Sequence, residues 1–290
     1  MPHAAVLGRP VAHSLSPVLH TAAYRALGLP DWRYHALTCG KGDLASVLGR
    51  LRGSSRWAGL SLTMPLKQVA VPLVDRVAPG SWGDGDLGAI NTVVVDGDRL
   101  VGHNTDVDGI AAGLAELGAP LGRVAVLGAG GTAFAVLAAL AAAGTFEVTL
   151  HARETSRASS SVNLAVRLGL HPVLAGLNQP ILGTTVSTLP AADEDLVVDG
   201  PLLDVRYTPW PTALGASVAA RGHRVVGGLP VLVGQAAEQV RLFTGQRAPV
   251  AVMRTAGETA LAARITHMGQ AGSARCRQDG SEAARGDPGR

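Results

Sequence analysis

One stretch decides the fold: Val124-Ala125-Val126-Leu127-Gly128-Ala129-Gly130-Gly131-Thr132-Ala133. Its four apolar residues predict a strand, and the glycines that follow match the G-x-G-x-x-G/A turn that leads from a strand into a helix. An Ala-rich helix over 133–143 and a strand over 147–151 complete a βαβ unit with a right-handed crossover. We therefore predict a Rossmann-like, dinucleotide-binding domain. The alternative is a glycine turn that only joins a strand to a helix.

The turn supplies the contacts that a dinucleotide needs. Gly128 permits the tight turn, Gly130 lets the backbone approach a pyrophosphate, and Ala133 keeps the helix close to the strand. Free N–H groups at the start of the helix face the anion. The predicted cofactor-binding residues of the turn are Gly128, Ala129, Gly130, Gly131, Thr132 and Ala133.

The choice of cofactor depends on the run that follows the second strand, His151-Ala152-Arg153-Glu154-Thr155-Ser156-Arg157. At this place an acidic residue holds the ribose of NAD, whereas an arginine accommodates the 2′-phosphate of NADP. Arg153 and Arg157 can clamp a phosphate from two sides, while Glu154 can take the acidic role. Because two guanidinium groups outweigh one carboxylate, the sequence favours NADP over NAD. A solvated surface turn is the remaining alternative.

Length and composition indicate a globular chain with two domains. The 290 residues are 47% hydrophobic and 16% charged, which excludes collagen-like and wholly disordered chains. At about 150 residues per domain, this length predicts two domains and a cleft. The expected limits are 1–104 for an α/β substrate-binding and catalytic domain, 105–120 for a connecting helix, 121–234 for the NADP-binding domain, 235–268 for helices that return to the first domain, and 269–290 for a disordered tail.

Charge and cysteine content narrow the partners and the compartment. The net charge is only +3 and the basic residues are scattered, which argues against nucleic-acid binding. Cys39 and Cys276 offer neither a disulfide framework nor a CxxC zinc site, so we expect a reducing, cytoplasmic compartment. The chain opens without a leader, and its long uncharged stretch over 124–146 is interrupted by glycines, so no membrane partner is expected. The histidines show no metal-binding spacing, so no metal is expected, and a monomer and a homodimer both remain open.

The first domain contains a lysine suited to proton transfer. Of the 25 basic side chains only Lys41 and Lys67 are lysines, and arginine cannot release a proton near neutral pH. Lys41 lies between two glycines in an evident loop. Lys67 instead stands at the end of a predicted strand with alternate polar residues, in the motif Ser61-Leu62-Thr63-Met64-Pro65-Leu66-Lys67. Lys67 is therefore the candidate group for chemistry.

Other polar side chains stand at the ends of predicted elements. Ser14 and Ser16 precede a helix over 17–27, which suits a carboxylate, although Ser16 alone would be an ordinary helix N-cap. Asn91 stands in a predicted hairpin, and Asp106 lies at the start of a helix over 105–117. A lone Asp106 would also be interpreted as an N-cap.

Together these motifs resemble shikimate dehydrogenase, a family of NADP-dependent enzymes that interconvert 3-dehydroshikimate and shikimate on the route to chorismate and the aromatic amino acids. The similarity runs from about Val6 to Met268 and rests on six motifs in order: S-x-S-P, [NS]-x-T-x-P-x-K, A-x-N-T, N-T-D, G-A-G-G-x-A and a late Q-A-A. Any one motif is weak, but the ordered set is specific.

The resemblance implies a role for each matching residue. Lys67 and Asp106 would transfer the proton. Ser14 and Ser16 would hold the substrate carboxylate, Thr63, Asn91 and Gln235 the ring hydroxyls, and Tyr207 a carboxylate or cofactor-side contact; Ser187 and Gly228 would join the cofactor site.

The chain departs from the family pattern at three places. Ser61 stands where many members have Asn, Gly227-Gly228-Leu229-Pro230-Val231 replaces Asp-Gly-Leu-Gly-Met, and Ala152-Arg153-Glu154 replaces Asn-Arg-Thr. The catalytic pair is unchanged. Two alternative functions remain: a relative that acts on quinate or an amino analogue of shikimate, and a non-catalytic, dinucleotide-dependent regulatory module.

Overall fold

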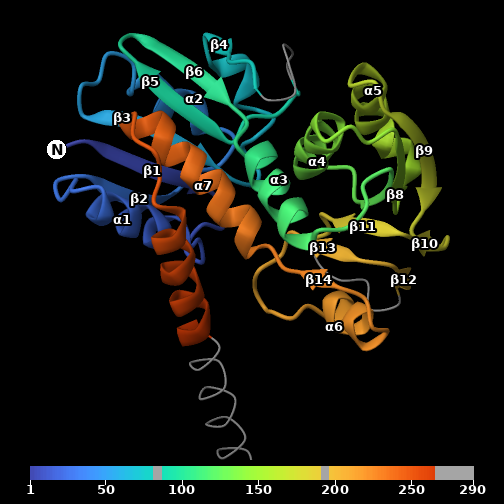
Figure 1. Ribbon diagram of the computed structural model, residues 1–290. Helices are drawn as coiled ribbons and strands as arrows, with labels where there is room; N and C mark the ends of the chain where they lie inside the picture. The colour runs from blue at the N-terminus through green and yellow to red at the C-terminus, as the bar shows by residue number, and fades with distance from the viewer. Residues whose placement is uncertain (81–86, 191–195, 265–290) are drawn as a thin grey trace, which may run out of the picture.

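The computed structural model describes residues 1–80, 87–190 and 196–264, so the expected tail at 269–290 lies outside the described residues. Two six-stranded sheets stand side by side, and helices α3 (Asp106–Leu117) and α7 (Leu229–Thr244) pass between them (Figure 1). Among the helices of the described residues, none combines the length and the apolar character needed to cross a bilayer.

The first sheet is mixed and has the strand order β2-β1-β3-β5-β6-β4. β1 pairs in parallel with β2 and β3, because a helix crosses over between successive strands, whereas β5 and β6 form the expected antiparallel hairpin. The elements are β1 (His3–Gly8), α1 (Ser16–Ala26), β2 (Arg33–Thr38), α2 (Leu44–Gly49), β3 (Trp57–Leu62), η1 (Val71–Leu73), β4 (Arg76–Val77), β5 (Thr92–Asp96) and β6 (Arg99–His103).

The second sheet is parallel throughout and has the order β14-β13-β11-β7-β8-β9. The order reverses between β7 and β11, which is the switch point where doubly wound sheets bind ligands. The predicted Rossmann-like fold is therefore confirmed. Its elements are β7 (Arg123–Leu127), α4 (Gly131–Ala142), β8 (Glu147–Ala152), η2 (Thr155–Ala158), α5 (Ser159–Arg167), β9 (His171–Gly176), β11 (Thr184–Ser187), β13 (Leu202–Asp204), α6 (Ala213–Ala220) and β14 (Val225–Val226), with a short pair of β10 (Ile181–Leu182) and β12 (Val198–Asp199) beside it.

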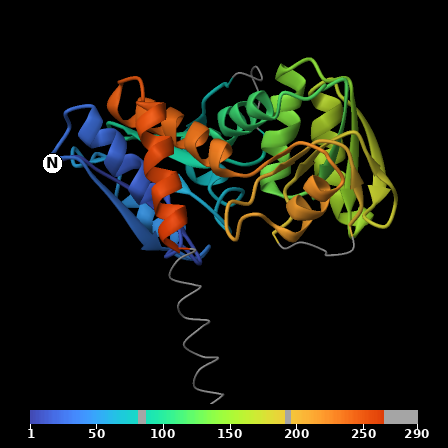
Figure 2. The ribbon, with the colours of Figure 1, turned by 60° about the horizontal axis from the view of Figure 1, so that its bottom comes forward.

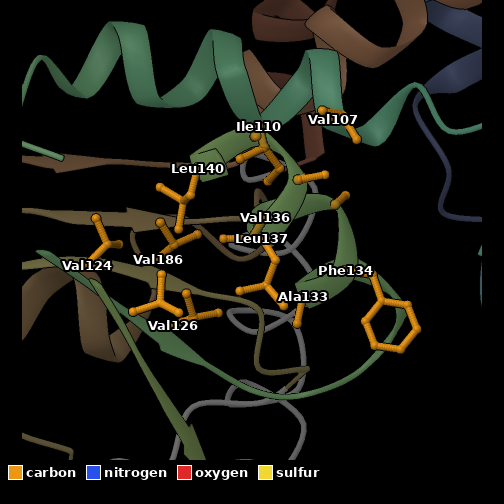
Figure 3. Packing of buried hydrophobic residues seen from close by; sticks show 14 of the residues in the cluster. Val107, Ile110, Val124, Val126, Ala133, Phe134, Val136, Leu137, Leu140 and Val186 are labelled. Carbon is orange, nitrogen blue, oxygen red and sulfur yellow. The ribbon is translucent and has the colours of Figure 1, made fainter. Parts of the chain in front are cut away.

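Helix α4 is buried on nearly every side (Figure 3). Its apolar side chains, including Val136 and Leu137, pack against β7 and β11 on one side. Val107 and Ile110 of α3 belong to the same cluster. Burial on both sides explains why this segment is rich in Ala, Val and Leu and lacks a polar face.

Helix α7 begins at Leu229 rather than at Gln235, where the sequence predicted it to start. Pro230 lies in its first turn, where the missing N–H is not needed and the fixed φ suits a helix. The expected domain limit at 234/235 therefore falls inside one continuous helix. The α3 and α7 backbones approach closely: a Cβ on Gly234 would come within 3.0 Å of the Gly109 Cα.

The chain ends, as far as it is described, in a helix over residues 250–264 beside α1 (Figure 2). Met253 of this helix joins Leu19 of α1 and Val240 of α7 in one buried cluster. The C-terminal helices thus return to the first sheet, and α7 places its own polar residues beside the ends of β3 and β5.

Candidate active site

A pocket of ≈ 240 Å³ lies between the first sheet, α7 and the turn after β7. It collects residues that are far apart in the chain. Every substrate-binding or catalytic residue that the sequence suggested lines it: Ser14, Ser16, Thr63, Lys67, Asn91, Asp106, Tyr207 and Gln235. Thr132 and Gly228 of the predicted cofactor set line it as well, so the two predicted sites adjoin.

Lys67 and Asp106 form an ion pair on the wall of the pocket. Lys67 lies in the segment after β3, and Asp106 is the first residue of α3, where a carboxylate is favourable because it faces the positive end of the helix dipole. The side chains are 19% and 11% exposed, so the pair is largely shielded but open to a ligand. The alternative in which Asp106 is an N-cap is wrong, because Thr105 occupies that position. The N–H of Asp106 itself donates to Asn104 Oδ1 at 3.2 Å.

Asn91 holds the Asp106 carboxylate from the other side. Its Nδ2 donates to Asp106 Oδ1 at 2.8 Å and to Thr105 Oγ1 at 3.0 Å. Its Oδ1 accepts from the Thr105 N–H at 2.8 Å, while Asn104 donates to the Ala89 carbonyl at 2.9 Å. The segment before β5 and the start of α3 are therefore tied together, and the position of the carboxylate is set by both.

The two serines line the same pocket from the start of α1. The interpretation of Ser16 as an N-cap is wrong, since Leu15 takes that position and its side chain makes no capping hydrogen bond. Ser14 Oγ instead accepts from the Ser16 N–H at 3.2 Å, which leaves the Ser14 hydroxyl proton for another partner. The Ser16 side chain also has a hydrogen bond with the Tyr34 hydroxyl. His20 contacts the Ser16 carbonyl at 2.9 Å and stacks on Tyr34, which steadies this turn.

Tyr207 lines the pocket from the segment after β13. Burial raises the pKa of its hydroxyl above the usual range, so it remains a hydrogen-bond donor at neutral pH.

The turn after β7 has the geometry that an anion requires. Gly128 has φ +100°, and a Cβ there would meet Thr188 Oγ1 at 2.5 Å, so only glycine fits. A Cβ on Gly130 would meet only open space, and no side chain caps the first turn of α4. Ser161 steadies the turn by donating to the Ala129 carbonyl at 3.1 Å. The backbone N–H groups of this turn can therefore receive a pyrophosphate.

The run after β8 is exposed at Arg153 and Glu154. Arg153 precedes the short helix η2, and Arg157 lies within it, so the two arginines do not share one helix. His151, at the end of β8, is buried against the Gly176 carbonyl at 3.0 Å.

The other two predicted cofactor residues differ in their setting. Ser187 is the last residue of β11 and is 1% exposed. It is not one of the described residues that line the pocket. Gly228 is the N-cap of α7 and donates its N–H to the Arg206 carbonyl at 2.9 Å.

Sequence analysis missed two residues that the structure adds to this region, Tyr34 and Gln239. Gln239 is 1% exposed and lines the pocket, and Tyr34 donates to Ser61 at 2.6 Å. The spacing of Gln239 from Gln235 was the available signal, because residues four apart share one helix face. Within the described part of the chain, no three His, Cys, Asp or Glu side chains gather as a metal site.

Comparison with known proteins agrees with this geometry. The model of the shikimate dehydrogenase substrate binding domain matches residues 6–93, and that of the shikimate 5'-dehydrogenase C-terminal domain matches residues 228–256. The shikimate dehydrogenase (NADP(+)) of Geobacter metallireducens is 36% identical over 271 residues, which covers 86% of this chain and 93% of that protein. The chain belongs to the shikimate dehydrogenase family.

Two solved structures extend the similarity to three dimensions. Shikimate dehydrogenase of Mycobacterium tuberculosis is 39% identical with a TM-score of 0.79, covering 91% of this chain and 100% of that one. The Thermus thermophilus enzyme, solved in complex with NADP(H) and shikimate, is 36% identical with a TM-score of 0.77, covering 90% and 100%. The family and the two-domain α/β fold predicted from the sequence are confirmed.

Proposed function

We propose that this chain is an NADP-dependent oxidoreductase that reversibly reduces 3-dehydroshikimate to shikimate, a step of chorismate and aromatic amino acid biosynthesis. One observation carries the proposal: the Lys67–Asp106 ion pair lies in a pocket that is also lined by Ser14 and Ser16 and by Thr132 of the nucleotide turn. A proton donor, a carboxylate-binding end and a cofactor turn are the parts that this reaction needs.

The turn after β7 fits NADP. The space over Gly130 and the uncapped start of α4 suit the pyrophosphate, which the backbone of Gly128 to Ala133 would hold. Arg153 and Arg157 would serve the 2′-phosphate, and Gly228, together with the end of β11 at Ser187, would border the nicotinamide side. When bound, the cofactor supplies or accepts the hydride.

Lys67 supplies the proton. As a carbonyl is reduced, negative charge builds on its oxygen, and the Lys67 ammonium relieves that charge by donating a proton from Nζ. Asp106 orients the ammonium, and Asn91 in turn orients Asp106. In the oxidation direction the same nitrogen takes up the proton of the hydroxyl. General acid–base help of this kind contributes about 10²–10⁴-fold to the rate.

The remaining pocket residues would position the ring. Ser14 and Ser16 donate their hydroxyl protons to the carboxylate, with Tyr207 as a further donor. Thr63 and Gln235 contact ring hydroxyls. Asn91 already donates to Thr105 and Asp106, so it reaches a hydroxyl by exchanging the Thr105 contact.

A turnover assay tests the proposal. Purified protein is mixed with shikimate or quinate and with NADP or NAD, and formation of the reduced cofactor is followed by absorbance. We expect the highest kcat/KM with shikimate and NADP, and almost none for Lys67→Met. Higher efficiency with quinate would assign the chain to the quinate alternative. Binding of shikimate and NADP by calorimetry without turnover would favour the regulatory module.

We also propose that the enzyme works in the cytoplasm as a monomer or a homodimer. The buried Cys39 is a free thiol, which suits a reducing compartment. Size-exclusion chromatography with light scattering distinguishes the two assembly states.

A further inference from the structure

Gln239 occupies the centre of a hydrogen-bond chain along one wall of the pocket. Its Oε1 accepts from Ser61 Oγ at 2.8 Å, and Ser61 Oγ accepts in turn from the Tyr34 hydroxyl at 2.6 Å. These contacts fix which end of the Gln239 amide faces β3: the carbonyl is turned to Ser61, so the NH₂ group is turned to the other side.

The NH₂ group of Gln239 sets the orientation of Gln235. Gln239 Nε2 donates to Gln235 Oε1 at 2.7 Å, and Gln235 Nε2 donates to the Leu232 carbonyl at 2.9 Å. With the carbonyl of Gln235 held from behind, its second N–H hydrogen is the part of the amide that can serve a ligand in the pocket. Gln235 is thereby presented as a donor.

The same NH₂ group reaches toward the catalytic pair. Gln239 Nε2 donates to Thr92 Oγ1 at 3.0 Å, and Thr92 Oγ1 donates to Asn91 Oδ1 at 2.9 Å. Asn91 is also held by the Thr105 N–H at 2.8 Å, so it keeps its place by a second contact. Loss of Gln239 would therefore affect Gln235 more than it affects Asn91 and Asp106.

We propose that Gln239 is a positioning residue that orients the Gln235 amide as a hydrogen-bond donor to a ring hydroxyl of the substrate. The proposal deepens the function proposed above and rests on it. Gln239 is buried, and its proposed effect passes through Gln235. Its removal should weaken substrate binding while the chemical step proceeds.

The test is a double-mutant cycle of Gln239→Met and Gln235→Met, with steady-state kinetics in shikimate. Methionine keeps the length of glutamine and removes its hydrogen bonds. Gln239→Met should cost the substrate one neutral hydrogen bond, the one that Gln235 would donate to a ring hydroxyl. We therefore expect Gln239→Met alone to raise the KM for shikimate by about 5–10-fold, with kcat and the KM for NADP changed less than about twofold. In the Gln235→Met background, Gln239→Met should add less than about twofold. The exposed Gln246→Met is the matched control and should change nothing.

Two results would overturn the proposal: an unchanged KM for shikimate in folded Gln239→Met, or an equal rise in both backgrounds. If Gln239→Met does not fold, Gln239→Glu takes its place, because a carboxylate keeps the size and polarity but cannot donate to Gln235. The same rise in the KM for shikimate is expected, and an unchanged KM would overturn the proposal. If the wild-type protein fails to turn over shikimate, the proposed function fails. In that case calorimetry measures the affinity of the same variants for shikimate. A failure of the proposed function can then be told apart from a failure of the positioning role of Gln239.

Discussion

Replacing Lys67 with methionine separates proton transfer from binding. The change keeps the length and most of the apolar stem of the side chain and removes the ammonium that pairs with Asp106. Asp106 keeps its hydrogen bond from Asn91 at 2.8 Å, so the carboxylate stays in place with one partner fewer. Ser14, Ser16 and Gln235 are untouched.

The size of each effect follows from these contacts. Loss of a general acid–base group lowers kcat by at least about 10²-fold. The KM for shikimate should stay within a few-fold, because the ammonium acts mainly in the transition state. The Asp106 side chain is 11% exposed and retains Asn91, so the free energy of unfolding should fall by about 1–3 kcal/mol, below the range for a fully buried broken pair.

Lys67→Arg separates charge from proton transfer. Arginine keeps the ion pair and with it most of the stability, yet it cannot release a proton near neutral pH, so kcat should fall here too. Steady-state kinetics and guanidinium unfolding measure both quantities, with exposed Lys41→Met as the control. A rate above about half of the wild-type value in Lys67→Met or Lys67→Arg would refute the proton-transfer role.

Other residues give three further predictions. The double variant of Ser14→Ala and Ser16→Ala should raise the KM for shikimate at least tenfold, with a smaller loss of kcat, since each hydrogen bond to a carboxylate contributes about 1.5–3 kcal/mol; an unchanged KM would mean that neither serine touches the substrate. Wild-type kcat/KM should be at least about tenfold higher with NADP than with NAD, and this preference should be smaller at high salt. Arg153→Ala should lower kcat/KM for NADP alone, and Glu154→Thr should raise kcat/KM for NADP. Better wild-type turnover with NAD would reverse the choice of cofactor. Burial lowers the pKa of His20 to about 4 from an unfolded value near 6.5, so the unfolded chain binds this proton first as the pH falls. The stability that neutral His20 contributes is complete above about pH 6.5 and is lost as the pH falls toward 4, so the free energy of unfolding in denaturant should fall by about 2 kcal/mol between pH 7 and 5. A His20→Gln variant whose free energy of unfolding depends on pH as steeply as that of the wild type would contradict this.

The sequence by itself determined the second sheet and the nucleotide turn. A strand, a glycine turn and an Ala-rich helix are local features, and the positive φ at Gly128 is the conformation that a glycine there allows. The ordered motifs likewise identified the family and the pocket residues. The sequence did not predict β9, β10 or β12, because their local signals are weak. β9 is an edge strand that contains Pro172, and β10 and β12 are only two residues long.

Only the tertiary structure decided which of the polar residues touch. Local patterns allowed Ser16 and Asp106 to be N-caps, and neither is, because neighbouring residues occupy those positions and Asp106 is engaged by Lys67 and Asn91. Gln239 had no motif of its own. It meets Ser61 across 178 residues because α7 returns to the first sheet beside the end of β3. Hydrogen bonds between such distant residues depend on how whole helices and sheets pack, and one sequence encodes that packing only in the sum of all its contacts.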